Sequence, residues 1–201
     1  RFPASPRHTT ASAGTVNVGP LIPGALNNVN LQLANQGTST ALTISSAVAS
    51  APTGCTVGAI TAPAPIAAGA QANLVLPITP SAGVGTFSFT LTINNNDVNE
   101  GAYTLTIQGT RGMTGTYNVG AGQTYLNPGA AFDDLEAFGV AGAVTLSIAS
   151  GTYVPGASYG LGIDSLSSPL PVRGLSSTNT LLIQSATTGG AVIDGAAFID
   201  P

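Results

Sequence analysis

Hydrophobic and polar residues alternate along several short stretches in the first half of the chain. The clearest stretch is GTFSFTLTINN, in which Phe87, Phe89, Leu91 and Ile93 alternate with serine and threonine. Because successive side chains of a β-strand point to opposite faces of the sheet, this alternation predicts a strand with one buried face. The same alternation occurs in LQLANQG, ALTISSAV, ANLVLPITP and AYTLTIQG, with Gly, Pro and Asn between them. Short strands at this spacing predict a β-sandwich over residues 15–111.

Residues 112–201 follow a different pattern. A helix is predicted on an apolar face formed by Ala130, Ala131, Leu135 and Phe138. We expect Asp133 and Asp134 to lie early in this helix, where negative charge suits the dipole, and Gly139 to end it. The stretch VTLSI then predicts a strand, and later apolar runs in YGLGID, TLLIQS and AVIDG have the irregular intervals typical of parallel β-helix rungs.

The two patterns together predict an all-β fold with three segments. Residues 1–14 form an extended N-terminal arm, residues 15–111 an immunoglobulin-like (Ig-like) β-sandwich, and residues 112–201 a short β-helical or β-rich region with one capping α-helix.

The predicted sandwich resembles a known family of bacterial repeats. The motifs are NQGTSTALTI, then Cys55 and Val57 one residue apart, then PIAAGAQANLVLPITPSAGVGTFSFTLTINNND and LTIQGT. In order and spacing they resemble bacterial Ig-like surface repeats of the choice-of-anchor or ASPM–SPD-2–Hydin type, in which a strand ends in N-x-G. One departure is Pro77, where the family has an apolar residue. Since proline cannot donate a ladder hydrogen bond, Pro77 predicts an edge or bulged strand.

The second half resembles another kind of bacterial surface protein. The stretch GTYNVGAG, the helix and GVAGAVTLSIASGTY are similar to the N-terminal cap and first coils of right-handed parallel β-helix proteins. The resemblance implies an extracellular or cell-surface location. A full β-helix needs more rungs than the sequence holds before Pro201. Since the chain starts at Arg1 without a methionine, we expect a processed mature chain or a fragment of a longer one.

Charge narrows the range of partners. Only 6% of residues are charged, lysine is absent, and the formal net charge is −4. The first fourteen residues hold Arg1, Arg7 and His8 with no acid, so the arm is basic and the remainder acidic. An acidic chain without a basic patch disfavours binding to nucleic acid or to an anionic membrane. No apolar run is long enough to cross a bilayer, so no membrane insertion is expected.

Few residues can support catalysis. The single cysteine, Cys55, excludes an intrachain disulfide, and the single histidine, His8, gives a catalytic triad or a histidine metal site nothing to build on. A carbohydrate-active β-helix enzyme is an alternative, because three acids follow isoleucines in rung-like runs, with Arg173 as a nearby cation: Asp164, Asp194 and Asp200. A turn explains the same acids. We therefore assign no catalytic or cofactor-binding residue.

Two binding functions remain open. In NNNDVNEG, Asp97 and Glu100 offer two carboxylates for calcium, although an Asn-rich hairpin turn explains the same residues. Tyrosines could stack on sugar rings if exposed together, which leaves a polysaccharide or another surface ligand open: Tyr103, Tyr117, Tyr125, Tyr153 and Tyr159.

The remaining features favour a structural role. A β-helix that stops after a few rungs exposes unpaired backbone groups, and an extended arm can add a strand to a neighbour's sheet. We therefore expect an extracellular subunit that self-assembles lengthwise into a filament or surface fibre. The expected interface residues are Arg1, Phe2 and Arg7 of the arm with Val192 and Ile193 of the last strand. The alternative is a fragment of a large cell-surface adhesin stalk.

Overall fold

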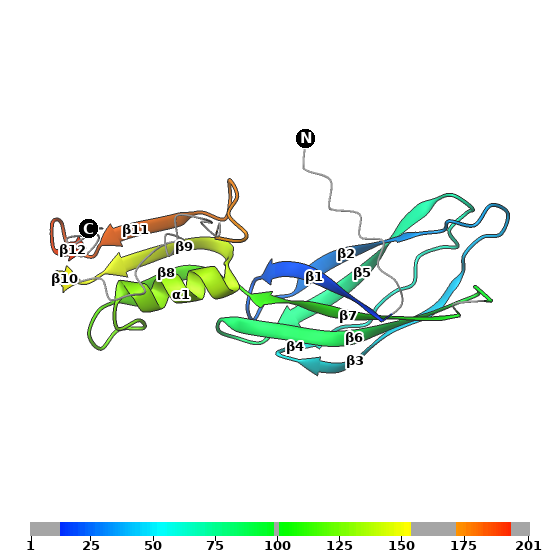
Figure 1. Cartoon of the computed structure of the whole chain (residues 1–201), viewed down its shortest axis with the longest axis horizontal. Helices are drawn as coiled ribbons and strands as arrows, with labels where there is room; N and C mark the ends of the chain where they lie inside the picture. The colour runs from blue at the N-terminus through cyan, green and yellow to red at the C-terminus, as the bar shows by residue number, and fades with distance from the viewer. Residues whose placement is uncertain (1–12, 99–100, 154–171, 194–201) are drawn as a thin grey trace, which may run out of the picture. The chain divides into compact units, whose positions relative to one another are not determined.

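A computed structural model describes residues 13–98, 101–153 and 172–193 (Figure 1). The chain divides into two compact units. The sandwich unit comprises Arg1–Ala82 and Thr86–Gly109, and the β-rich unit comprises Gly83–Gly85 and Thr110–Pro201. The described residues are mostly strands, with a single α-helix among them, so the predicted all-β fold class is confirmed.

The sandwich unit is built from two sheets. Its strands are β1 (Gly14–Leu21), β2 (Asn27–Ala34), β3 (Ile44–Thr53), β4 (Cys55–Val57), β5 (Gln71–Pro80), β6 (Gly85–Asn95) and β7 (Ala102–Arg111). One sheet has the order β1-β7-β6-β3 and the other β2-β5-β4. The third, sixth and seventh strands thus share one sheet and the second, fifth and fourth the other, as in an immunoglobulin fold, with the first strand beside the seventh.

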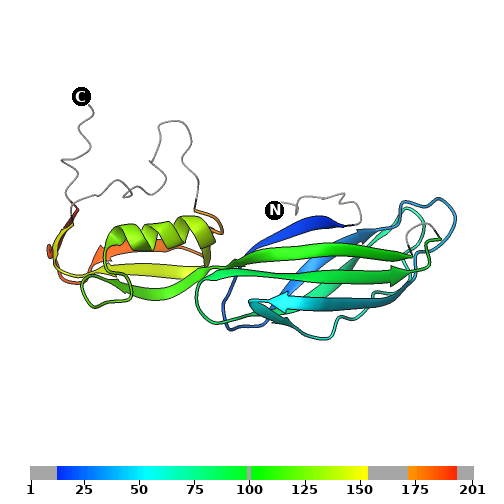
Figure 2. The same ribbon diagram turned by 60° about the horizontal axis from the view of Figure 1, so that its bottom comes forward.

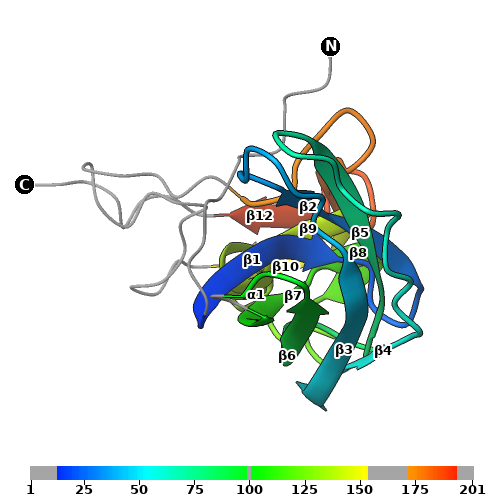
Figure 3. The ribbon, with the colours of Figure 1, turned by 90° about the vertical axis from the view of Figure 1, so that its right-hand side faces the viewer.

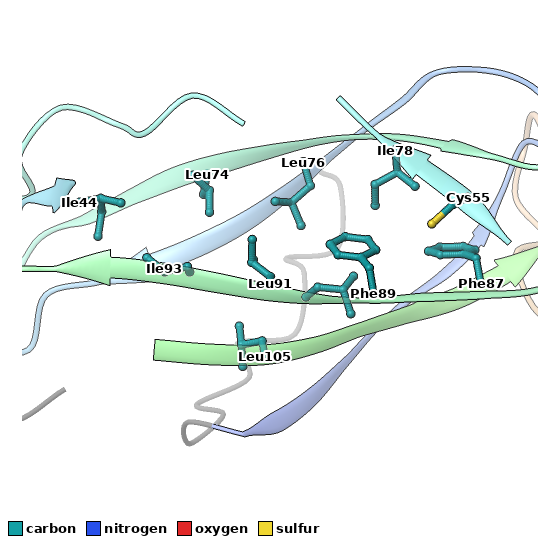
Figure 4. Close-up of a cluster of buried hydrophobic side chains, with 11 residues drawn as sticks. Ile44, Cys55, Leu74, Leu76, Ile78, Phe87, Phe89, Leu91, Ile93 and Leu105 are labelled. Carbon is teal, nitrogen blue, oxygen red and sulfur yellow. The ribbon is translucent and has the colours of Figure 1, made fainter. Parts of the chain in front are cut away.

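The core of the sandwich lies between β5 and β6. Figure 4 shows Phe89 and Leu91 of β6 pointing toward Leu76 of β5, and all three side chains are buried. They belong to the alternating apolar positions from which the strands were predicted. Burying each such side chain contributes about 1.5–3 kcal/mol, so this face holds the two sheets together. Cys55 lies in the same cluster as a small buried filler.

Pro77 does not mark an edge or a bulge, so that prediction is wrong. β5 is the central strand of its sheet, and Pro77 pairs with Asn28 of β2 in an uninterrupted register. The carbonyl of Pro77 accepts a hydrogen bond from the Gly58 N–H at 2.8 Å. The missing donor of Pro77 therefore faces Gly58, one residue beyond the end of β4, where the ladder stops and no strand hydrogen bond is lost.

The β-rich unit stacks parallel strands. Its elements are β8 (Met113–Val119), α1 (Pro128–Phe138), β9 (Val140–Ile148), β10 (Gly151–Tyr153), β11 (Leu181–Ser185) and β12 (Ala191–Ile193). β8, β9 and β11 form one sheet in the order β11-β9-β8, and β10 pairs with β12. The register aligns Tyr117, Leu146 and Ile183 in one column across the three strands. Leu146 at its centre is fully buried.

Helix α1 crosses one face of this sheet (Figure 2). The side chain of Asn127 caps its start by accepting a hydrogen bond from the Ala130 N–H at 3.0 Å. Gly139 ends it, as predicted, with a φ of 72° that favours glycine. The expectation that Asp133 and Asp134 lie early in the helix is wrong, because the helix starts at Pro128 and its first turn holds no acid. Their charges therefore gain little from the dipole.

Candidate assembly surface: two open strand edges

Among the described strands, β11 forms one edge of the parallel sheet. The Val144 N–H donates to the Thr180 carbonyl at 2.7 Å, and the Ala186 N–H donates to the Ile148 carbonyl at 2.7 Å. Backbone groups alternate in direction along a strand, so the even-numbered residues of β11 face β9. The N–H and C=O groups of Leu181 and Ile183 therefore point to the opposite edge, where no described strand pairs with them.

The open edge is also apolar. Leu181 and Ile183 are only half-buried, although they stack on Val144 and Leu146, which are buried in β9. The difference arises because, among the described strands, β9 has a neighbour on both sides and β11 on one. A further strand would cover these side chains and satisfy the backbone groups beside them.

The other edge of the same sheet is partly covered. The Tyr125 N–H donates to the Asn118 carbonyl at 3.2 Å, and the Tyr125 carbonyl accepts from the Gly120 N–H at 2.8 Å. The Tyr125 hydroxyl donates to Asp134 of α1 at 2.7 Å, and its ring lies 5.6 Å from that of Tyr117. Burial and the Asp134 hydrogen bond raise the pKa of Tyr125 above its usual value. Tyr125 thus fixes a loop over the end of β8, so the two edges of this sheet differ.

The sandwich unit has an open edge at β3. The Asn95 N–H donates to the Gly101 carbonyl at 2.9 Å, so the odd-numbered residues of β6 face β7 and the even-numbered ones face β3. Since Val48 pairs with Thr92, the even-numbered residues of β3 bond to β6 over the regular stretch from Ser46 to Ser50. The backbone groups of Ala47 and Ala49 therefore point outward. No described strand pairs with this edge.

An apolar groove lies beside β3. It has a volume of about 260 Å³ and runs between β3 and the chain that leaves β4, lined by Ala47, Ala49, Val57 and Ile60 among others. Figure 3 shows β3 and β4 next to each other at one side of the sandwich. No charged residue lines the groove or occurs in β3. The edge therefore lacks the charges with which many proteins block strand addition.

The predicted interface residues fall in two places. Arg1, Phe2 and Arg7 lie outside the described residues. Val192 and Ile193 lie in β12, where their backbones pair with Thr152 and Tyr153 of β10. The acids proposed for carbohydrate chemistry, with His8, also lie outside the described residues: Asp164, Asp194 and Asp200.

The calcium candidate cannot be assembled from described residues, because Glu100 is not among them. Asp97 is exposed, and its N–H donates to the Asn95 side chain at 2.7 Å. The Asn96 side chain accepts from the Thr43 N–H at 2.8 Å and donates to the Ala41 carbonyl at 3.0 Å. These asparagines thus hold the turn and its neighbouring loop together. Calcium at Asp97 and Glu100 stays a prediction.

The tyrosines of the β-rich unit pack inward. Tyr117, Tyr125 and Tyr153 are partly buried against the apolar cluster around Leu146, and the Tyr153 hydroxyl donates to the Ala149 carbonyl at 3.0 Å. Burial raises the pKa of the Cys55 thiol, which disfavours its reactive thiolate form. In the described ranges no three His, Cys, Asp or Glu side chains gather as metal ligands, and no helix is long and apolar enough to span a membrane.

The chain matches no protein-family model and no curated protein. Among solved structures it resembles the ASH/PapD-like domain 7 of human CEP192, with 14% identity, a TM-score of 0.34, and coverage of 53% of this chain and 89% of that one. It also resembles the secreted serine protease VesC from Vibrio cholerae, with 14% identity, a TM-score of 0.34 and coverage of 46% of this chain. The match spans 21% of the protease's length.

Sequence reasoning missed the β3 edge. β3 was expected only from ALTISSAV, and the strand order that leaves it at the edge does not follow from its own residues. A weak signal was present, because ISSAVAS contains no charged residue.

Proposed function

We propose that this chain is an extracellular structural protein whose copies assemble lengthwise into a filament or surface fibre by strand addition at open sheet edges. The single observation that supports it most is the asymmetry of the parallel sheet. Tyr125 covers the end of β8, whereas Leu181 and Ile183 of β11 present outward backbone groups and half-buried side chains. A sheet that can grow at one edge favours directional growth.

The stacked strands give this growth a physical basis. Each strand added to β11 extends the ladder of hydrogen bonds and the column that contains Leu146 and Ile183. In a stacked architecture every repeat gains stability from its neighbours, so the last one is the least stable until it is covered. That this unit is the cap and first coils of a right-handed β-helix is part of the proposal.

The bacterial surface location and the role of the arm are also proposals. The arm with Arg1, Phe2 and Arg7 is basic, and the remainder of the chain is acidic. Opposite charges attract, so this distribution favours contact between the arm of one copy and the body of another. The proposal assigns no enzymatic activity.

The adhesin-stalk alternative uses the same edge differently. In a stalk, further rungs of one longer chain would cover β11. Copies of the present chain would then associate only because those rungs are missing from it. The proposed subunit instead assembles in its native form. Electron microscopy of the native material separates the two, because a stalk appears as single long molecules and an assembly as repeating subunits.

Self-association of the full chain tests the proposal. We expect sedimentation velocity to show species that grow with concentration, and electron microscopy to show filaments. Gln184→Lys, at an exposed position of β11, should reduce this growth, because a lysine at a strand edge opposes strand addition. Asn73→Lys, at an exposed position of the central strand β5, adds the same charge and should leave growth unchanged. A chain that stays monomeric over a wide concentration range contradicts the proposal.

A further inference from the structure

The two open edges have the same internal arrangement. In each strand, the residues with outward-facing backbone groups are those whose side chains face the interior of their own unit. In β3, Ala47 and Ala49 pack against the sandwich core. In β11, Leu181 and Ile183 pack against the cluster around Leu146. If the two edges paired, the residues with outward backbone groups would hydrogen-bond to one another, and their side chains would lie on the same face of the joined sheet. The interior face of β3 would then continue into the interior face of β11.

We infer that β11 of one copy pairs antiparallel with β3 of the next copy, with Leu182 opposite Val48. This inference rests on the proposed function and names its contact. The register aligns the outward backbone groups of both strands where β3 is regular, between Ser46 and Ser50. It gives these pairs: Leu181 with Ala49, Leu182 with Val48, Ile183 with Ala47, and Gln184 with Ser46.

Side-chain size favours this register on the interior face. Leu181 and Ile183 are large and half-buried, whereas Ala47 and Ala49 are small and line the groove of about 260 Å³. The large side chains of one edge thus meet the small ones of the other, and they lie where the groove has room for them. Filling such a groove removes apolar surface from water on both copies.

The outer face matches as well. Val48 is 53% exposed and Leu182 is 50% exposed, and each is the large exposed apolar residue of its strand. In the inferred register they form a non-hydrogen-bonded pair, in which side chains approach most closely. The positions beside them carry serine and glutamine, which can remain in water.

Other edge pairings fit less well. Two β3 edges would place alanine against alanine and leave the groove unfilled, and two β11 edges would crowd leucine against isoleucine. β2 is also an edge strand without charge, but its interior residues are large, namely Val29, Leu31 and Leu33, and its exposed positions include Asn30 rather than an aliphatic residue. Pairing between different edges is heterologous, so it propagates head to tail.

Disulfide cross-linking between single-cysteine substitutions tests the pairing. Val48→Cys and Leu182→Cys are prepared as separate full-length chains, mixed and oxidised under conditions in which the unmodified chain assembles. A cross-strand pair at this separation suits disulfide geometry, so we expect a covalent dimer in the mixture and none from either variant alone. The unmodified chain, whose Cys55 is buried, is the background control. Asn30→Cys mixed with Leu182→Cys is the control at β2, another uncharged edge.

Each other result overturns the inference in a distinct way. Dimers from Val48→Cys alone, or from Leu182→Cys alone, indicate pairing between like edges. Dimers with Asn30→Cys instead of Val48→Cys place the contact at β2. Filaments without any cross-link reject the pairing and leave the proposed function standing, whereas an unmodified chain that does not assemble rejects the proposed function itself.

Discussion

Replacing the buried Asn35 should destabilise the sandwich unit more than replacing an exposed asparagine of the same unit. Asn35 is the first residue of the N-x-G motif and is only 8% exposed. Its amide nitrogen donates to the carbonyls of Thr40 and Ile66, both at 2.9 Å, and its side-chain oxygen accepts from the Gly37 N–H at 2.9 Å. One side chain thus joins two loops that are distant in sequence.

The magnitude follows from these bonds. Each contributes about 0.5–1.5 kcal/mol, and an unsatisfied buried partner costs more. The Ile66 carbonyl keeps a second donor, the Leu42 N–H at 2.9 Å, which limits the loss. We therefore expect Asn35→Ala to lower the free energy of unfolding by about 2–3 kcal/mol. For a unit of this size, that corresponds to a fall in Tm of roughly 10–20 °C.

Asn35→Asp separates hydrogen bonding from packing. The introduced carboxyl keeps the bond from Gly37 but faces two carbonyl oxygens, so its folded-state pKa should rise above the usual value of about 3.9. A raised pKa stabilises the fold below the unfolded-state value, and this contribution is lost as pH rises through the folded-state value. Asn35→Asp should therefore be closer to the original stability near pH 4 than near pH 7.

Urea denaturation followed by circular dichroism measures both variants. Asn73→Ala and Asn73→Asp are the matched controls, because Asn73 is exposed in β5, and surface changes of this kind usually stay within about 0.5 kcal/mol. If Asn35→Ala unfolds at the same urea concentration as Asn73→Ala, the account of the N-x-G motif as a hydrogen-bonded centre is wrong.

Three further outcomes are expected. Leu146→Ala removes the fully buried centre of the column in the β-rich unit and should cost about 2–5 kcal/mol in denaturation, whereas Leu182→Ala, at a 50% exposed position, should cost much less. Because the pKa of Tyr125 is raised, its contribution to stability is complete below the unfolded-state value of about 10 and is lost as pH rises above it. Tm measured between pH 9 and about 11 should therefore fall less steeply in Tyr125→Phe than in the unmodified chain. Cys55 should react with a thiol reagent only as the sandwich unfolds, and fast labelling of the native chain would contradict its burial.

Local alternation predicts the central strands, because a strand that buries one face needs an apolar residue at every second position. Phe87, Phe89 and Leu91 of β6 could be identified in this way. The sequence does not identify β1, because its half-buried positions Val16 and Val18 come just before Gly19 and Pro20, which are typical of a turn. The strand continues through them to Leu21.

Sheet order depends on contacts between distant residues, and alternation carries no information about it. Pro77 shows the consequence, since local rules for proline predict an edge or a bulge and Pro77 lies in a central strand. The decisive fact is where the partner strand ends, at Val57, which lies far away in sequence. For the same reason the sequence did not predict the candidate surface, because it placed the open strand at Val192 and Ile193. The apolar run at Leu181–Ser185 was visible, but the edge at β3 appears only when the sheet order is known.

Charge is the feature that connects both edges to the proposed assembly. Natural sheets commonly block their edges with lysine or inward charges, and this chain has no lysine and only 6% charged residues. The edge at β8 is covered instead by the chain itself, through the backbone bonds of Tyr125. β3 and β11 have neither charge nor such a cover among the described residues, and each exposes an aliphatic side chain, Val48 or Leu182. A monomer would gain solubility from a charge at either position, so the combination is most simply explained if both edges are covered by another copy.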